Sequence, residues 1–482
     1  MEESLNLKNF VNGHFVATEK QLENVEPAQG RILSYIPRSG VEEVDAAVVA
    51  AKKSFTSWSQ TTLDARADIL DAVANEIEVH CEEFALLESR DTGKPLSLAR
   101  SVDIPRAISN FRFFAGAVRH ASLESNPMAD AINYTQRTPL GVVALITPWN
   151  LPLYLLSWKT APALAMGNTI VAKPSELTPH TATRLAEVFV KVGLPDGVFN
   201  LVHGLGTEVG DALVKHEDVA AISFTGGTST GKLVAANAAP AFKKLSLELG
   251  GKNPTVVFAD CDFEKAVAGT LRAAFTNQGE ICLCGSRILV EESIFESFTD
   301  ALVEQTSKMV VDDPCKEQTQ CGALISAAHR DKVESYIALG KEEGGTIRCG
   351  GQRPELKGEC AQGFFVQPTI MTGLAPTCRT ASEEIFGPVV TIHPFKTESE
   401  ALDLANAGRY GLSASVWTQN LKRAHIFAQN LRTGMVWVNT WLKRDLRVPF
   451  GGMKDSGVGR EGGRYSLEFF SESKNICIEL GD

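Results

Sequence analysis

The sequence lacks any apolar run near the roughly 18 residues that a membrane helix needs. It also lacks an excess of positive charge, because 47 lysines and arginines face 58 aspartates and glutamates, giving a net charge of −11. That balance argues against a polyanion-binding surface, so we expect neither a nucleic-acid nor a membrane partner. The opening residues, MEESLNLKNFVNGHF, are acidic and have no apolar signal core. We therefore expect a cytoplasmic protein.

Metal-binding cysteine patterns are missing as well. None of the ten cysteines forms C-x-x-C, and no histidine stands at zinc-finger spacing, so we expect no metal site. Thiols of a protein that is not exported are expected to stay reduced, which disfavours disulfides. Internal repeats and Pro/Gly/Ser linkers are absent too. The 482 residues are enough for two or three domains of ordinary size.

Alternating strand and helix patterns are present from about residue 140 onward. GVVALITPWN, NTIVAKPSE, GVFNLVHG and VAAISFTGG have the β-branched runs of buried strands, and helical segments such as TATRLAEVFVKV separate them. This order predicts a parallel, doubly wound sheet. A second α/β series follows, with TVVFA, SRILVEES and GPVVTIHPF. INYTQRTPLG and KNICIEL alternate polar and apolar residues like isolated strands, whose open edges favour pairing with another subunit.

Two glycine-rich loops are candidates for binding phosphate. HGLGTEVG (203–210) contains G-x-G without the third glycine of the dinucleotide fingerprint at its usual place. FTGGTSTGKL (224–233) spells G-x-x-x-x-G-K, but Leu233 replaces the Ser or Thr that holds magnesium in a P-loop. Three interpretations stay open for this loop: a P-loop-like nucleotide-binding protein, a plain strand-to-helix turn, or a dinucleotide loop at a helix N-terminus.

Three residues are candidates for covalent chemistry on a carbonyl. Cys282, in FTNQGEICLCGSR, follows a glycine on a predicted loop and is either a nucleophile or a small buried hydrophobe. Asn150, in TPWNLP, ends a predicted buried strand and is either an oxyanion donor or a turn former. Glu248, in LELGGKNP, is either a half-buried base or an exposed strand residue. Cys284 fits the role of a buried neighbour.

The ordered motifs ITPWNLP, VAKPSE, SFTGG, LELGGKNP, FTNQGEICLC, EEIFGP and PFGGMKDSGVGRE together resemble the NAD(P)-dependent aldehyde dehydrogenase superfamily along nearly the whole chain. The resemblance implies that Cys282 attacks the aldehyde to give a thiohemiacetal and, after hydride transfer, a thioester. It implies that Asn150 supplies the oxyanion hole and that Glu248 activates the hydrolytic water. Glu280 departs from the glutamine that the family usually has two residues before its cysteine.

The same resemblance implies an NAD site. Its implied residues are Ile146, Thr147, Trp149, Lys173, Glu176, Gly206, Phe224, Gly226, Gly227, Leu249, Glu384 and Phe386. A carboxylate at Glu176 accepts hydrogen bonds from a free ribose 2′-hydroxyl and repels a 2′-phosphate, so NAD is expected over NADP. Gly227 stands where the family often has a serine that contacts the pyrophosphate.

Two arginines suggest the kind of aldehyde. Arg112, in NFRFFAG, and Arg444, in NTWLKRDLRVPFGG, stand among aromatics near the family's substrate tunnel, and guanidinium groups there suit a substrate carboxylate. Arg447 is expected to form a surface ion pair. The motifs are most similar to the branch that oxidises 2-aminomuconic and 2-hydroxymuconic semialdehydes, products of aromatic-ring breakdown; the amino form arises from tryptophan through kynurenine. A betaine-aldehyde, retinal or broad-specificity enzyme is the alternative.

The family resemblance also implies a division of the chain within the α/β fold class. We expect a Rossmann-like cofactor domain in residues 1–117 and 139–249 and an α/β catalytic domain in residues 250–450. A small β oligomerisation extension is expected in residues 118–138 and 451–482. The chain is expected to form a homodimer or homotetramer.

Overall fold

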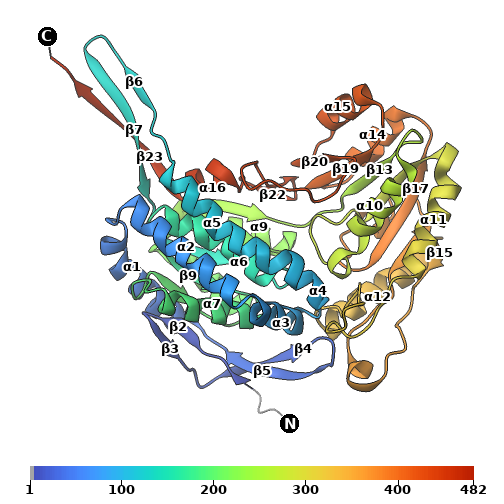
Figure 1. Cartoon of the computed structure of the whole chain (residues 1–482), viewed down its shortest axis with the longest axis horizontal. Coiled ribbons are helices and arrows are strands. Elements are labelled where there is room, and N and C mark those ends of the chain that lie inside the picture. Colours follow the sequence, from blue (N-terminus) through green and yellow to red (C-terminus); the bar gives the residue numbers. More distant parts are fainter. Residues whose placement is uncertain (1–4, 482) are drawn as a thin grey trace.

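The computed structural model describes residues 5–481, and its largest sheet has a parallel centre (Figure 1). Across the sheet the strands are β22 (Gly457–Val458), β12 (Lys244–Glu248), β11 (Val219–Thr225), β8 (Val142–Ile146), β9 (Thr169–Lys173), β10 (Phe199–Leu201), β2 (Asn9–Val11) and β3 (His14–Val16). The five strands from β12 to β10 run parallel. β8 and β9 are buried along their whole length, as continuous apolar runs in covered parallel sheets are.

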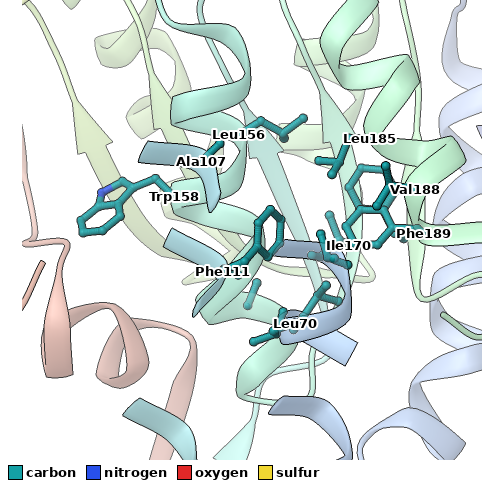
Figure 2. Packing of buried hydrophobic residues seen from close by; sticks show 14 of the residues in the cluster. Leu70, Ala107, Phe111, Leu156, Trp158, Ile170, Leu185, Val188 and Phe189 are labelled. Carbon is teal, nitrogen blue, oxygen red and sulfur yellow. The ribbon is translucent and has the colours of Figure 1, made fainter. Parts of the chain in front are cut away.

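Helices cover both faces of this first sheet, which makes it doubly wound. One face packs against α2 (Leu63–Val79), α3 (Cys81–Thr92), α5 (Ile104–Arg119), α6 (Pro152–Ala165) and α7 (His180–Lys191). The other face packs against α1 (Val41–Trp58), α8 (Asp211–Lys215) and α9 (Thr228–Ala238). In Figure 2, Phe111 of α5 packs in the same cluster as Leu70 of α2 and Ile170 of β9, and its ring centroid is 6.4 Å from that of Phe189 of α7.

A second sheet forms the other lobe of the molecule (Figure 1). Its order is β15 (Thr346–Cys349), β16 (Thr369–Thr372), β17 (Val389–Phe395), β14 (Arg287–Glu291), β13 (Pro254–Val257), β19 (Ser413–Trp417) and β20 (Met435–Val438). α10 (Phe263–Phe275) and α11 (Phe295–Ser307) pack on one face, and α14 (Glu398–Asn406) and α15 (Leu421–Asn430) on the other. α12 (Ala327–Glu342) and α13 (Arg379–Ser382) contact each other beside this sheet.

The third sheet is an arm that projects from the first lobe (Figure 1). β7 (Ala131–Pro139) pairs antiparallel with β6 (Ser125–Pro127) and with β23 (Ser471–Glu479). The expectation of two isolated strands was therefore wrong, because the two segments pair with each other. α16 (Gly463–Phe469) leads into β23.

Shorter elements complete the fold, namely β1 (Leu5–Asn6), β4 (Gln21–Glu26), β5 (Arg31–Pro37), α4 (Leu96–Leu98), β18 (Tyr410–Gly411) and β21 (Met453–Lys454). The segment expected to form part of the oligomerisation extension also contributes to the first sheet, because β22 pairs antiparallel with β12 at its edge. No helix within residues 5–481 is both long enough and apolar enough to cross a membrane.

Candidate active site

A cavity of about 510 Å³ is lined by residues of both lobes. Its first wall consists of residues at the carboxyl ends of β8, β9, β11 and β12, where ligands of open parallel sheets bind. All twelve residues expected to hold NAD line this cavity: Ile146, Thr147, Trp149, Lys173, Glu176, Gly206, Phe224, Gly226, Gly227, Leu249, Glu384 and Phe386. Cys282, Asn150 and Arg444 line it too.

Cys282 lies on the turn between α10 and β14, where it is half-buried. The turn is held in place by Asn253, whose Nδ2 donates to the carbonyl oxygens of Cys282 at 2.7 Å and Cys284 at 2.9 Å. Burial, and then the charge of Glu248, raise the pKa of the Cys282 thiol above its ordinary value. The thiol is therefore protonated at neutral pH, and its activation requires a base or a nearby positive charge.

Cys284 does not line the cavity. Its side chain is buried, and Sγ lies 3.9 Å from the carbonyl oxygen of Thr276. Burial raises the pKa of Cys284 to about 12. These surroundings are those of a packed, unreactive thiol.

Glu248 is the last residue of β12 and is only 3% exposed. Neither carboxylate oxygen has a hydrogen-bond partner among the described residues, so both are free to accept from water. Burial, and then the charge of Glu461, raise the pKa of Glu248 well above its ordinary value. Glu248 does not itself line the cavity, but the next residue, Leu249, does.

Asn150 follows β8 in the loop that leads into α6, and it is buried. Its Nδ2 donates to the carbonyl oxygen of Glu280 at 2.8 Å. An amide nitrogen carries two hydrogens, so one remains for an acceptor in the cavity. The side chain of Asn150 is thereby tied to the segment that carries Cys282, two residues beyond Glu280.

The end of the cavity next to α9 has features that fit a pyrophosphate. α9 begins at Thr228 directly after Gly226 and Gly227, and no side chain caps its first turn. The buried Oγ1 atoms of Thr147 and Thr225, which both line the cavity, have no hydrogen-bond partner among the described residues. Free donors at a helix N-terminus attract an anion. A dinucleotide loop is thus the interpretation of FTGG that fits best, ahead of a P-loop.

Lys173 and Glu176 also line this cavity. Nζ of Lys173, the last residue of β9, donates to Oε2 of Glu176 at 2.8 Å. This pair presents both an acceptor and a donor for hydroxyl groups. The net effect of a carboxylate at this point is to disfavour a further phosphate.

Glu384 and Phe386 come from the second lobe. Oε1 of Glu384 accepts from the backbone N–H of Gly251 at 2.7 Å. Phe386 has a φ of 61°, which non-glycine residues rarely adopt, and its ring meets that of Trp149 edge to face at 5.3 Å. Strained residues that persist cluster at functional sites, which fits Phe386 as part of a ligand-binding wall.

His329 also lines the cavity, although no motif in the sequence marked it as a site residue. It is a lone histidine near the start of α12, and its Nε2 lies 2.7 Å from the carbonyl oxygen of Phe386. Burial lowers the pKa of His329 to about 4, so the ring is neutral and holds the backbone at Phe386.

Arg444 lines the cavity together with Tyr154 and Phe450. Its guanidinium donates to the Tyr154 hydroxyl at 2.7 Å and lies 4.1 Å from the ring centroid of Phe450. No carboxylate within residues 5–481 is in ion-pair distance of it. Arg447, by contrast, forms the expected surface ion pair with Asp445.

Arg112 is not at the cavity, which corrects the expectation drawn from its aromatic neighbours. Its side chain is 43% exposed and pairs with Glu78 of α2 on the outer surface. Arg106 does not line the cavity either, but it packs against a residue that does, since six residues along a helix correspond to a rotation of about 240°. The Arg106 guanidinium lies 5.4 Å from the ring centroid of Tyr154, a lining residue, and its buried Nε and Nη2 have no hydrogen-bond partner among the described residues.

Comparison with known proteins agrees with this geometry. The sequence profile of the aldehyde dehydrogenase family matches residues 15–476. A 2-aminomuconic 6-semialdehyde dehydrogenase from Pseudomonas sp is 48% identical over 98% of either chain. A 2-hydroxymuconic semialdehyde dehydrogenase from Pseudomonas sp. (strain CF600) is also 48% identical, over 98% of this chain and 99% of that one. The structure of an aldehyde dehydrogenase from Bacillus cereus in complex with NAD+ has a TM-score of 0.96 and 40% identity, covering 98% of this chain and 97% of that one.

Proposed function

The chain belongs to the aldehyde dehydrogenase family, and from this premise we propose that it oxidises a semialdehyde bearing a carboxylate, with NAD as the hydride acceptor. The proposed substrate is 2-aminomuconic 6-semialdehyde, and the 2-hydroxy analogue is a second substrate, because relatives named for each are 48% identical to this chain. The observation that carries the choice of a carboxylate is the pair of guanidinium groups, Arg106 and Arg444, that both contact Tyr154.

In the proposed acylation step, Cys282 is the nucleophile. Its sulfur forms a bond to the aldehyde carbon, the thiol proton passes to a base, and the carbonyl oxygen becomes an oxyanion. The free N–H of the Asn150 amide donates to that oxygen, an interaction that strengthens as the charge develops. Bound NAD supplies the acceptor for the hydride that the aldehyde carbon then loses, which leaves a thioester on Cys282.

In the proposed deacylation step, Glu248 acts as the general base. Its carboxylate oxygens have no protein partner, so one can accept a proton from a water that attacks the thioester carbon. The carbon–sulfur bond breaks, the carboxylic acid leaves, and Cys282 returns to its starting state. The raised pKa of Glu248 makes it a stronger base than an exposed carboxylate.

The remaining lining residues, beside α9 and β9 and from the second lobe, fit NAD. The uncapped first turn of α9 and the unpartnered Thr147 and Thr225 hydroxyls suit the pyrophosphate, and Glu176 suits a free 2′-hydroxyl. Glu384 suits the hydroxyls of the second ribose. Burial raises its pKa, and the positive charges of Lys332 and Lys252 counteract that rise. These are the donors and acceptors that a dinucleotide without a 2′-phosphate requires.

The proposal is tested by following NADH absorbance with a panel of aldehydes. The muconic semialdehydes are expected to give the highest kcat/KM, with hexanal intermediate and betaine aldehyde lowest, because two arginines repel its quaternary ammonium. NADP is expected to be a poor replacement for NAD. Equal kcat/KM for hexanal and the semialdehydes would contradict the carboxylate preference and indicate a broad-specificity enzyme.

We propose as well that the protein is cytoplasmic and forms a homodimer or homotetramer through its arm. The support is that β6 and β23 leave unpaired edges, with Met128 and Ile478 exposed on the arm. All cysteines of the described residues are free thiols, which fits a reducing compartment. Sedimentation velocity tests the assembly, and a monomeric mass would contradict it.

A further inference from the structure

A buried ionic cluster lies behind Asn150 and has no part in the chemistry described above. It comprises Lys94, Glu88 and Asp103, whose side chains are at most 1% exposed. Lys94 follows Gly93, which ends α3 with a φ of 77°, and Asp103 directly precedes α5. Nζ of Lys94 donates to Oδ2 of Asp103 and lies 3.8 Å from Oε1 of Glu88. Removing three ionisable groups from water is unfavourable, so other interactions of the protein must offset the cost of this cluster.

The third contact of Lys94 reaches the site. Its Nζ donates to the backbone carbonyl oxygen of Asn150 at 2.9 Å. This carbonyl belongs to the loop between β8 and α6, and no backbone N–H of the described residues donates to it. Its second donor is Nδ2 of Asn277, at the longer distance of 3.3 Å. A fully buried ammonium is thus the stronger anchor of the Asn150 backbone.

The side chain of Asn150 is anchored from the other lobe. Its Nδ2 donates to Glu280 of the segment that carries Cys282. Lys94 belongs to the first lobe, so the backbone carbonyl and the side-chain amide of Asn150 are hydrogen-bonded to different lobes. The remaining N–H of the amide has a fixed direction only while the backbone cannot shift. Glu88 adds to this, because its Oε2 accepts from the N–H of Leu153 in the first turn of α6.

We propose that Lys94 is a positioning residue for the oxyanion hole, acting through the carbonyl of Asn150. This inference rests on the oxyanion role proposed for Asn150. A displacement of about 1 Å in a positioning group can cost about 100-fold in rate. Loss of the Lys94 contact is therefore expected to lower the rate of thiohemiacetal formation without changing NAD affinity.

The test is a double-mutant cycle that combines Lys94→Met/Asp103→Asn with Asn150→Ala. Removing the buried pair together avoids leaving the Asp103 carboxylate uncompensated. Burial raises the pKa of Glu88 to about 7, so that carboxyl can become neutral, and the variant is expected to fold. The readouts are kcat/KM for hexanal, which makes no use of the arginines, the dissociation constant of NAD and the melting temperature. Asp103→Asn alone is the partner control, because Lys94 can still donate to Asn150. Arg287→Met is the matched control, since Arg287 is a buried cation that donates to carbonyls of Leu404 and Ala405, at the end of α14.

Lys94→Met/Asp103→Asn is expected to lower kcat/KM by about 10- to 100-fold and to leave the dissociation constant of NAD unchanged. Asp103→Asn alone is expected to stay within about threefold of the parent. In the Asn150→Ala background the loss from the pair is expected to shrink to less than about twofold, because coupled residues are non-additive. Arg287→Met is expected to lower the melting temperature, with effects that add to those of Asn150→Ala.

Two results would overturn the inference while leaving the proposed function intact. The first is a pair variant as active as Asp103→Asn, and the second is a loss of the same size in both Asn150 backgrounds. Full activity of Asn150→Ala itself would instead remove the oxyanion role of Asn150, and the positioning role of Lys94 with it.

Discussion

Replacing Arg444 with glutamine tests the proposed recognition of a substrate carboxylate most directly. In the structure the Arg444 guanidinium donates one hydrogen bond to the Tyr154 hydroxyl and lies over the Phe450 ring. Arginine has five N–H donors in all, so several remain for a carboxylate. A hydrogen bond to a charged group contributes about 1.5–3 kcal/mol. At about 1.4 kcal/mol per decade, the KM for a muconic semialdehyde is expected to rise about 10- to 150-fold.

The assay compares this substrate with hexanal, which has no carboxylate, at saturating NAD. The KM for hexanal is expected to stay within about threefold, because only the packing on Phe450 and the hydrogen bond to the Tyr154 hydroxyl are lost. Arg106→Gln is expected to behave like Arg444→Gln. Arg112→Gln is the matched control: it lies on the same helix as Arg106, but its guanidinium pairs with Glu78 on the surface, so neither KM is expected to change.

Equal losses for the charged and the uncharged aldehyde would refute the reasoning, since they would indicate a packing role for Arg444. A rise in the KM of the semialdehyde with Arg112→Gln, and none with Arg106→Gln, would contradict the assignment made from the structure. Unchanged KM values with both Arg106→Gln and Arg444→Gln would indicate that the substrate carboxylate binds elsewhere.

Four further variants test individual residues of the site. Glu248→Gln is expected to give a rapid burst of NADH and then a slow steady state, because deacylation loses its base. In the parent, the rate of deacylation is expected to fall as pH drops through the raised pKa of Glu248. A steady-state rate of the variant equal to the parent's would remove Glu248 from the mechanism. Cys284→Ser is expected to keep most turnover in the same NADH assay, whereas Cys282→Ser is expected to lose it, and the reverse outcome would exchange their roles. Gly227→Ser is expected to lower the dissociation constant of NAD about two- to tenfold in a fluorescence titration. The added hydroxyl contributes about 0.5–1.5 kcal/mol, and a Cβ at this position has open space around it. Weaker binding would place the pyrophosphate elsewhere.

Local patterns were sufficient to predict the parallel centre of the first sheet and the presence of a second α/β series. β8 and β9 are short, β-branched and buried on both faces, so their residues carry the information about their surroundings. The residues proposed to bind NAD were named only because the motifs resemble the family, and strand patterns alone would not have selected them; in the structure all twelve line one cavity. The pairing of β7 with β23 was not predictable, because alternation shows that a strand is half-exposed but does not identify its partner.

The arginines show where a sequence-based interpretation fails. The aromatic residues beside Arg112 are buried, yet Arg112 itself faces outward, because neighbours along a helix point in different directions. Arg106 has no aromatic neighbour in the sequence, and only the packing of α5 on α6 brings it to Tyr154. Lys94 is similar: within Gly-Lys-Pro it is typical of an exposed turn, and only the fold places Asp103 and Asn150 around it.

The pairing of β7 with β23 has a consequence for how the protein is made. The five parallel strands of the first sheet all precede residue 250, so this sheet can begin to form while the ribosome is still adding the second lobe. β7 cannot complete its sheet at that stage, because Ala131 pairs with Glu479, which is synthesised after the whole second lobe. The arm is therefore completed only once the second lobe has been made. Assembly through the arm would then be restricted to chains that already contain both lobes.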